Sequence, residues 1–397
     1  MGKENAMTPK GYLFSAAEAA IKKPGRKDLA LIFSEQEAVM SGNFTTNRVK
    51  AAPVKLDMKR IRSGRGRAIV VNSGNANACR GEEGMRDALE MTELVSCALG
   101  INMKGVYVCS TGVIGTPLPM GRIRPVIPKL TKGLGKSTVD DVAAAIMTTD
   151  TFPKVVSRRL KLADRTVTIT GLCKGAGMIS PLMATMLCFI LTDARIARSA
   201  LDAALSLAVR ESFNKITIDG DRSTNDTVLV MANGMARNET VEKGSADFKK
   251  FVRALSDVTS ALSRMIVRDG EGATKLVEIE VRNAKNTRDA EKAAFSVANS
   301  LLVKTAIYGN DANWGRIMAA LGHSGISMRE EKTDISFGKV RIVLRGLATG
   351  KEGEAADVLR QREIRITINL HIGNSSARVL TCDLTEDYVR INAEYRT

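Results

Sequence analysis

The run KGAGMISPLMATMLCFIL, residues 174–191, joins a glycine-rich loop to an apolar segment. Residues 186–191 are all apolar, which is typical of a strand buried on both faces. Thr185 places a hydroxyl at the start of this strand, directly after the small residue Ala184. If the bond between these two residues breaks, Thr185 becomes N-terminal: its hydroxyl is then a nucleophile, and its own amine can act as the base. The simpler alternative is that Ala184 and Thr185 merely begin a strand, since Thr favours strands.

Length and composition are those of an ordinary globular protein. The 397 residues allow roughly two to three domains of about 150 residues each. The six cysteines are scattered without a CxxC pair, which indicates a reducing compartment. No apolar run approaches the ~20 residues of a membrane helix, and the polar stretch Met1–Lys10 does not resemble a secretory signal. We therefore expect a cytoplasmic protein with no membrane partner.

Histidine is scarce, with only His323 and His371 in the chain. The sequence has no HExxH motif and no His pair, so the usual zinc ligand sets are missing and no metal site is expected. Because only these two histidines occur, a nucleophile activated by histidine is also improbable. This scarcity favours a nucleophile that carries its own base.

The formal net charge is +16, but Lys and Arg are spread along the chain and aromatic residues make up only 4%. Stacking platforms for single-stranded nucleic acid need aromatic side chains. We therefore expect no nucleic-acid partner, although a basic nucleic-acid-binding protein remains a rival interpretation. A positive field also attracts small anionic substrates such as amino-acid carboxylates.

The pattern of apolar residues predicts a mixture of strands and helices without internal repeats. Strands often follow strands directly, so an α/β sandwich with mixed or antiparallel sheets is favoured over a doubly wound parallel sheet. Strands are expected at 67–72, 105–109, 165–170, 186–191, 227–232, 277–281, 339–344, 364–372 and 376–382, and helices at 86–99, 139–148, 197–210, 248–267, 290–302 and 314–321.

Several polar loops accompany the junction at Thr185. Ser110–Gly115 is expected to form a turn after a short strand, where backbone N–H groups and the Thr111 hydroxyl can face a developing oxyanion. The other polar loops are Asn72–Asn77, Met147–Thr151, Asp219–Asp226 and Asp269–Ala273. Each of these segments could equally be an ordinary solvated loop. One segment is similar to the end of a phosphate-binding P-loop: Lys132-Gly-Leu-Gly-Lys136-Ser137. The first glycine of that motif is replaced by Leu130, so we do not expect a P-loop here.

Taken together, these segments resemble the ornithine acetyltransferases, the glutamate N-acetyltransferases of the cyclic arginine pathway. The segments that carry the resemblance are Lys174–Leu187, Ser110–Gly115, Asn72–Asn77, Asp269–Ala273 and Asn310–Arg316. The resemblance runs from about Gly11 to Thr397, nearly the whole chain. It implies a two-domain α/β fold with mixed sheets in an αββα-type, N-terminal-nucleophile-like sandwich.

The resemblance also implies roles for individual residues. Thr185 matches the self-cleaving nucleophile, and the bond between Ala184 and Thr185 matches the processing site. Thr111 and Gly112 match the oxyanion pair. The positions that match those holding the amino-acid substrate are Thr148, Lys174, Thr185, Glu271, Asn392 and Thr397. Ser180 and Leu182 depart from the usual family residues, but neither matches a functional position.

The resemblance implies an α-chain of residues 1–184 and a β-chain of residues 185–397, associated as α2β2. The expected reaction moves an acetyl group from N-acetylornithine to glutamate through an acetyl ester on Thr185, in arginine biosynthesis. No dissociable cofactor is expected, although acetyl-CoA could serve as a second acetyl donor. A related self-processing aminopeptidase or amidase, in which water accepts the acyl group, remains the main alternative.

Overall fold

The computed structural model describes residues 6–180 and 186–395. The chain divides into two compact units. The first unit consists of the described residues of Met1–Gly175, Leu182–Asn214 and Arg222–Met265, and the second of Ala176–Pro181, Lys215–Asp221 and Ile266–Thr397. Each unit therefore contains segments from well-separated parts of the sequence.

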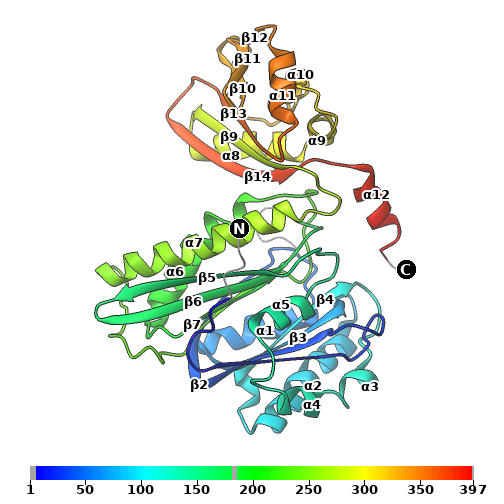
Figure 1. Cartoon of the computed structure of the whole chain (residues 1–397), viewed down its shortest axis with the longest axis vertical. Helices are drawn as coiled ribbons and strands as arrows, with labels where there is room; N and C mark the ends of the chain where they lie inside the picture. Colours follow the sequence, from blue (N-terminus) through cyan, green and yellow to red (C-terminus); the bar gives the residue numbers. More distant parts are fainter. Residues whose placement is uncertain (1–5, 181–185, 396–397) are drawn as a thin grey trace. The chain divides into compact units, whose positions relative to one another are not determined.

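The first unit is built on an eight-stranded mixed sheet with the order β4-β3-β2-β8-β7-β6-β5, in which β1 pairs with β2 (Figure 1). The pairs β3–β4 and β7–β8 are parallel, and the other neighbours are antiparallel. Its strands are β1 (Tyr12–Ala17), β2 (Leu29–Phe44), β3 (Arg65–Asn75), β4 (Val106–Val113), β5 (Lys154–Leu162), β6 (Arg165–Lys174), β7 (Leu187–Thr192) and β8 (Thr227–Ala232).

The parallel pair β7 and β8 forms the centre of this sheet. Every residue of both strands is buried, because their sequences, LCFILT and TVLVMA, carry apolar side chains toward both faces. The helices of this part of the chain are α1 (Ala52–Arg60), α2 (Gly81–Leu99), α3 (Met120–Ile123), α4 (Ile127–Lys132), α5 (Val139–Ala145), α6 (Arg198–Arg210) and α7 (Ala246–Arg268).

Local sequence explains how the best-defined of these helices begin and end. Helix α2 starts with Glu82 and Glu83 in its first turn and stops at Gly100, which has a left-handed backbone. Helix α5 begins with a capping box between Thr138 and Asp141. Apolar side chains of α2 and α4 pack together in one core cluster with residues of β2, β3 and β4.

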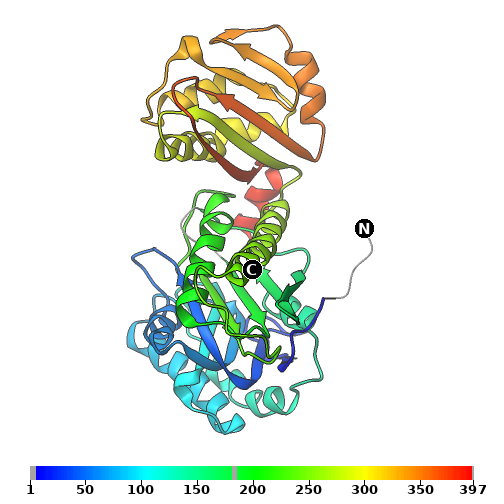
Figure 2. The same ribbon diagram turned by 90° about the vertical axis from the view of Figure 1, so that its left-hand side faces the viewer.

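The second unit contains a six-stranded sheet with the order β12-β11-β10-β13-β9-β14. Strands β13 and β9 pair in parallel, and the β10–β11, β10–β13, β11–β12 and β14–β9 pairs are antiparallel. Helix α8 packs on β9 and β14, the neighbours at one side of this sheet (Figure 2). The elements are β9 (Leu276–Ala284), β10 (Asp334–Phe337), β11 (Val340–Leu344), β12 (Leu347–Ala348), β13 (Glu363–Asn369), β14 (Ser375–Cys382), α8 (Thr287–Asn299), α9 (Leu301–Tyr308), α10 (Trp314–Gly322), α11 (Glu352–Leu359) and α12 (Glu386–Ala393).

The expected fold class is confirmed: the protein is α/β, has mixed sheets and is organised in two parts. Strand β8 has the expected bounds, 227–232, and β7 differs from the expected strand by one residue at each end. Within residues 6–180 and 186–395, no helix combines the length and apolar character that a membrane crossing requires.

Several expected boundaries were wrong. The expected turn at Ser110–Gly115 is largely strand, because β4 stays paired with β3 as far as Val113. The expected helix 290–302 is two helices separated by Ser300, whose side chain accepts the N–H of Val303 and caps α9. The expected helix 139–148 ends at Ala145, so Thr148 lies in the loop that follows.

Candidate active site

Most of the residues predicted for the site lie within the described part of the chain. Thr111, Gly112, Thr148 and Lys174 belong to the first unit, and Glu271 and Asn392 belong to the second. Ala184, Thr185 and Thr397 lie outside the described residues. Each unit therefore holds its own part of the predicted set.

Thr111 and Gly112 lie near the end of β4, where the strand is paired in parallel with Ser73 and Gly74 of β3. A β-bulge at Gly74 and Asn75 interrupts the regular register there. Gly112 has φ = +136°, and a Cβ at this position would lie 2.2 Å from the carbonyl carbon of Gly74. Only glycine fits this backbone, so the close approach of the two strands fixes the direction of the peptide groups beside Thr111.

Buried amide side chains hold the end of β4 in place. Asn225 Nδ2 donates to the carbonyl oxygen of Ser110 at 2.8 Å and to that of Ala76 at 2.6 Å. The Ser110 hydroxyl donates to Asn72 Oδ1 at 2.6 Å. The polar segments that contain Asn72 and Asn225 thus satisfy buried polar groups next to Thr111, a role that makes them structural supports of the site.

Asp150 is the centre of a buried polar cluster in the same unit. Its Oδ1 accepts the Lys154 ammonium at 2.7 Å and the N–H of Gly175 at 2.6 Å. Its Oδ2 accepts the N–H of Thr148 at 3.1 Å and lies 4.0 Å from Lys174 Nζ. One carboxylate therefore fixes two lysines and two stretches of backbone, including the expected substrate residues Thr148 and Lys174.

The charges of this cluster settle the protonation of its carboxyl group. Burial by itself would raise the pKa of Asp150, but Lys174, Lys154 and the N–H of Gly175 outweigh it and hold the pKa at about 2. Asp150 is therefore an anion at neutral pH, and it can hold the ammonium of Lys174 in one position.

Lys174 also reaches the expected oxyanion residue. Its Nζ donates to Thr111 Oγ1 at 3.4 Å, and both side chains are buried. Because the Thr111 oxygen accepts this bond, the hydroxyl hydrogen is directed to a different acceptor. Such a hydroxyl, next to a fixed peptide group and an ammonium, is suited to stabilise negative charge on a carbonyl oxygen.

In the second unit, Glu271 and Asn392 are in direct contact. Asn392 Nδ2 donates to Glu271 Oε2 at 2.8 Å and to the Tyr388 carbonyl oxygen at 3.0 Å. The backbone approaches closely as well: a Cβ on Gly177 would lie 2.4 Å from the Glu271 carboxyl carbon. The Glu271 carboxylate is thus enclosed between a glycine-rich stretch and helix α12, in a setting suited to a ligand ammonium group.

The structure brings Thr148 and Lys174 to Asp150, links Thr111 to this cluster through Lys174, and brings Glu271 and Asn392 together. Asp150 was missed as a site residue. Its position in the run Met-Thr-Thr-Asp-Thr, four residues before Lys154, is the one sequence feature that could have indicated it.

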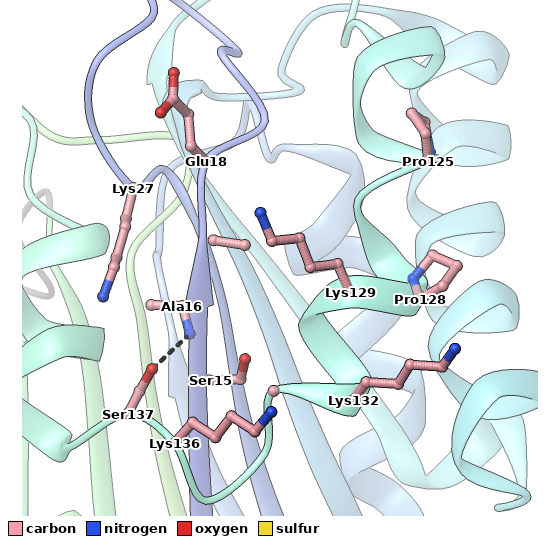
Figure 3. Close-up of a pocket in the computed structure, with 12 residues that line it drawn as sticks. Ser15, Ala16, Glu18, Lys27, Pro125, Pro128, Lys129, Lys132, Lys136 and Ser137 are labelled. Atoms are coloured by element: carbon pink, nitrogen blue, oxygen red, sulfur yellow. Dashed lines mark hydrogen bonds between the residues drawn. The ribbon is translucent and has the colours of Figure 1, made fainter.

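A separate depression of about 770 Å³ lies in the first unit and is lined by Lys27, Lys129, Lys132 and Lys136 among others (Figure 3). No described residue of the predicted site is among those that line it. The P-loop-like segment borders this depression, but the backbone N–H groups of residues 133–136 all donate to carbonyl oxygens of the protein. They are therefore engaged within the fold, whereas a phosphate cradle needs free N–H groups.

Within residues 6–180 and 186–395, no group of three or more His, Cys, Asp or Glu side chains is arranged to hold a metal ion.

Comparison with known proteins identifies the family. The family model described as the ArgJ family matches residues 13–397. The chain belongs to the ArgJ family. It is 54% identical over 393 residues to the arginine biosynthesis bifunctional protein ArgJ of Geobacter sulfurreducens, covering 98% of this chain and 100% of that protein. It is 50% identical over 394 residues to the protein of the same name from Caldanaerobacter subterraneus subsp. tengcongensis, covering 98% of each.

A solved structure is also similar. The crystal structure of the arginine biosynthesis bifunctional protein argJ from Bacillus halodurans matches with a TM-score of 0.50 and 48% identity. The match covers 52% of this chain and 97% of that chain. Membership of the ArgJ family confirms the resemblance and the expected class of enzyme: the protein is an acyltransferase of arginine biosynthesis.

Proposed function

We propose that this ArgJ-family protein moves an acetyl group from N-acetylornithine to glutamate, and that it first cleaves its own chain between Ala184 and Thr185. The observation that carries the proposal is the cluster of Thr111, Lys174 and Asp150, because it pairs a hydroxyl donor with a fixed cation at a glycine-constrained strand end. That arrangement suits acyl transfer through an oxyanion.

In the first stage, the Thr185 hydroxyl attacks the carbonyl carbon of Ala184. A C–O bond forms, the C–N bond breaks, and the hydroxyl proton passes to the departing nitrogen, which becomes the α-amine of Thr185. Water then opens the ester and gives a free Ala184 carboxyl group and a free Thr185 hydroxyl. The new amine, with an unperturbed pKa of about 7.7–8.0, can accept a proton near neutral pH.

In the second stage, this amine takes the proton of the Thr185 hydroxyl while Oγ attacks the acetyl carbonyl of N-acetylornithine. The amide C–N bond of the donor breaks, and its nitrogen receives a proton. Ornithine then departs, while the acetyl group remains bound to Thr185 as an ester. The amine of glutamate attacks this ester, and N-acetylglutamate is released with the hydroxyl restored. Thr111 and the N–H of Gly112 are the proposed donors to each tetrahedral oxyanion, and the exchange is ping-pong.

The proposed substrate residues divide by charge. The Lys174 ammonium is proposed to bind a substrate carboxylate. Glu271, which accepts a hydrogen bond from Asn392, is proposed to bind a substrate ammonium together with Asn392. Thr148, Thr185 and Thr397 complete the proposed set. Acetyl-CoA is a possible second acetyl donor, as the name "bifunctional" borne by the relatives suggests. The two pieces are proposed to stay associated as α2β2 in the cytoplasm.

The match to the Bacillus halodurans structure supports cleavage. Nearly all of the matched chain, 97%, aligns with only 52% of this one. A chain of about half this length is what a relative cut into two pieces would give.

The test is to purify the protein and compare it with Thr185→Ala on a denaturing gel and in a transfer assay. Wild type is expected to give two fragments, residues 1–184 and 185–397, and to move labelled acetyl from N-acetylornithine to glutamate. Thr185→Ala is expected to remain one chain without activity. Intact wild-type protein with full transfer activity would contradict the mechanism, and acetyl release to water without transfer would identify a hydrolase instead.

A further inference from the structure

Strand β4, which carries Thr111 and Gly112, lies at one end of the strand order of its sheet and pairs with β3. Alternate residues of such an edge strand direct their backbone groups away from the neighbouring strand. These outward N–H and C=O groups need hydrogen-bond partners when they are buried. In β4 the partners are side chains from other segments of the first unit.

Helix α1 supplies two of these side chains. Both carboxyl oxygens of Asp57 lie 3.2 Å from the backbone nitrogen of Val108, whose N–H they accept. Arg60 donates from Nη1 to the carbonyl oxygen of Val106 and from Nη2 to Thr92 Oγ1, the latter at 2.9 Å. Asp57 and Arg60 are both buried, and α1 packs against β4. Helix α1 thus binds the edge of β4 at the positions where another strand would pair.

A third side chain continues the series toward the candidate site. Asn225 Nδ2 donates to the carbonyl oxygen of Ser110 at 2.8 Å. Side chains therefore bind β4 at residues 106, 108 and 110, and Gly112 is the next residue in this alternation. We call the three side chains of Arg60, Asp57 and Asn225 the edge clamp. The edge clamp ends two residues before the proposed oxyanion donor.

Apolar packing alone does not account for Asp57. Burial raises the pKa of its carboxyl group well above the usual value, and the Val108 N–H, Arg60 and Cys109 lower the pKa to a smaller extent. Burying a carboxyl group costs stability, and an apolar side chain of the same size would fill this space without that cost. What the apolar side chain would lack is the hydrogen bond to β4.

We infer that Asp57 and Arg60 are positioning residues, which hold β4 so that Thr111 and the Gly112 N–H face the reacting carbonyl group. The inference rests on the proposed acetyl transfer. Oxyanion donors act when they lie about 2.7–3.1 Å from the oxygen that becomes charged. A displacement of about 1 Å can lower the rate roughly a hundredfold. A strand fixed on one edge by β3 and on the other by the edge clamp restricts such displacements.

The proposed substrate groups are held by different contacts. Asp150 lies beside Lys174, and Asn392 donates to Glu271. Loosening β4 at Val108 is therefore expected to impair the stabilisation of the transition state more than the binding of the substrates. In kinetic terms, kcat falls while KM changes little. A general loss of structure does not produce that separation.

The test compares Asp57→Leu with wild type in acetyl transfer from N-acetylornithine to glutamate, per molecule of processed enzyme. Leu has a similar size but cannot accept the Val108 N–H. We expect kcat to fall roughly tenfold to a hundredfold with KM for both substrates within about threefold of wild type. Arg60→Met, which cannot donate to Val106, is expected to lower kcat roughly threefold to tenfold, so the test does not depend on the folding of Asp57→Leu alone.

Hydrogen–deuterium exchange of peptides that cover β4 measures the clamp without reference to activity. Exchange in these peptides is expected to be at least about tenfold faster in Asp57→Leu than in wild type, because the strand edge opens more often. Asp57→Asn retains an acceptor oxygen and is expected to keep both kcat and the exchange rate within about threefold of wild type.

Asp193→Leu is the matched control in the same unit. Asp193 is also buried and also accepts backbone N–H groups, those of Thr168 at 2.8 Å and Lys10 at 3.2 Å. It follows β7 at the end where Thr192 pairs with Ile169, whereas Lys174 pairs at the other end of that strand. Asp193→Leu is expected to lower the melting temperature while kcat and exchange in β4 stay within about twofold of wild type.

Four results would overturn the inference: a kcat in Asp57→Leu within twofold of wild type, a rise in KM as large as the fall in kcat, an equal loss of kcat in Asp193→Leu, or a loss in Asp57→Asn as large as in Asp57→Leu. The wild-type protein tests the proposed function separately. Wild type without acetyl transfer refutes that function, whereas unchanged exchange across β4 in Asp57→Leu refutes the clamp itself.

Discussion

The ammonium of Lys174 lies 4.0 Å from the Asp150 carboxylate, with both side chains buried. Asp150 also accepts the ammonium of Lys154 at 2.7 Å. In a low-dielectric interior, removing one partner from such a cluster leaves the others uncompensated. Asp150 is therefore one residue on which the position of the Lys174 cation depends.

Asp150→Asn is expected to lower the free energy of unfolding by roughly 3–5 kcal/mol at pH 7, because it leaves buried lysines without their carboxylate. The pKa of Asp150 is about 2 in the folded protein, below its value in the unfolded chain. Its stabilising contribution is therefore complete above about pH 4 and is lost as the pH falls toward about 2. Urea unfolding followed by circular dichroism at pH 7 and pH 3 should show the gap between wild type and variant narrowing at the lower pH.

Asp164→Asn is the control for this experiment. Asp164 forms an ion pair with Arg165 at 3.4 Å, but its side chain is 79% exposed. Exposed pairs contribute at most about 1 kcal/mol. Two results would contradict the stabilising role of the ionised Asp150. One is a loss of unfolding free energy in Asp164→Asn as large as that in Asp150→Asn. The other is a difference in unfolding free energy between wild type and Asp150→Asn that widens as the pH falls.

Thr111→Val is expected to lower kcat for acetyl transfer by roughly 10²–10³, measured per molecule of processed enzyme, because one oxyanion donor is lost. Thr111→Ser keeps the hydroxyl that Lys174 contacts at 3.4 Å and should retain most of the rate. Equal losses in the two variants would contradict the oxyanion role, because Thr111→Ser retains the hydroxyl that Thr111→Val removes.

Much of the fold and part of the site could be predicted from the sequence. Strands β7 and β8 are apolar throughout most of their length, and a run of that kind has few alternatives to a buried strand. Thr111 and Gly112 were singled out because a hydroxyl and glycines follow an apolar segment and because the family resemblance implies an oxyanion pair at these positions. Their conformation was not found, because pairing with β3 extends β4 through the residues expected to turn.

Asp150 shows why the remainder was beyond prediction. It looks like an ordinary loop residue in the sequence. Its contacts are made with a distant segment, through the backbone N–H of Gly175 and the ammonium of Lys174. Such contacts are set by tertiary packing and leave no periodic pattern in the chain.

Gly112→Ala is expected to destabilise the protein severely and abolish transfer, because its Cβ would lie 2.2 Å from the Gly74 carbonyl carbon. Gly115→Ala is a matched control: Gly115 also has positive φ, +85°, but a Cβ added there would have no atom of the described residues within 4 Å. The Gly115→Ala variant is therefore expected to be destabilised only by backbone strain, by about 1–2 kcal/mol. Thermal unfolding of both variants checks this, and equal melting temperatures would refute the steric argument.

Glu271→Gln tests whether the charge of the carboxylate binds substrate. Gln retains an oxygen that can accept the Asn392 bond, seen here at 2.8 Å, but it lacks the negative charge. Since a hydrogen bond to a charged group contributes about 1.5–3 kcal/mol, KM for N-acetylornithine is expected to rise roughly tenfold to a hundredfold with little change in kcat. Glu386→Gln, which alters an exposed carboxylate at the start of α12, should leave KM within about twofold of wild type. An unchanged KM in Glu271→Gln would show that the carboxylate charge does not contribute to substrate binding. The role of Glu271 would then be limited to its contact with Asn392.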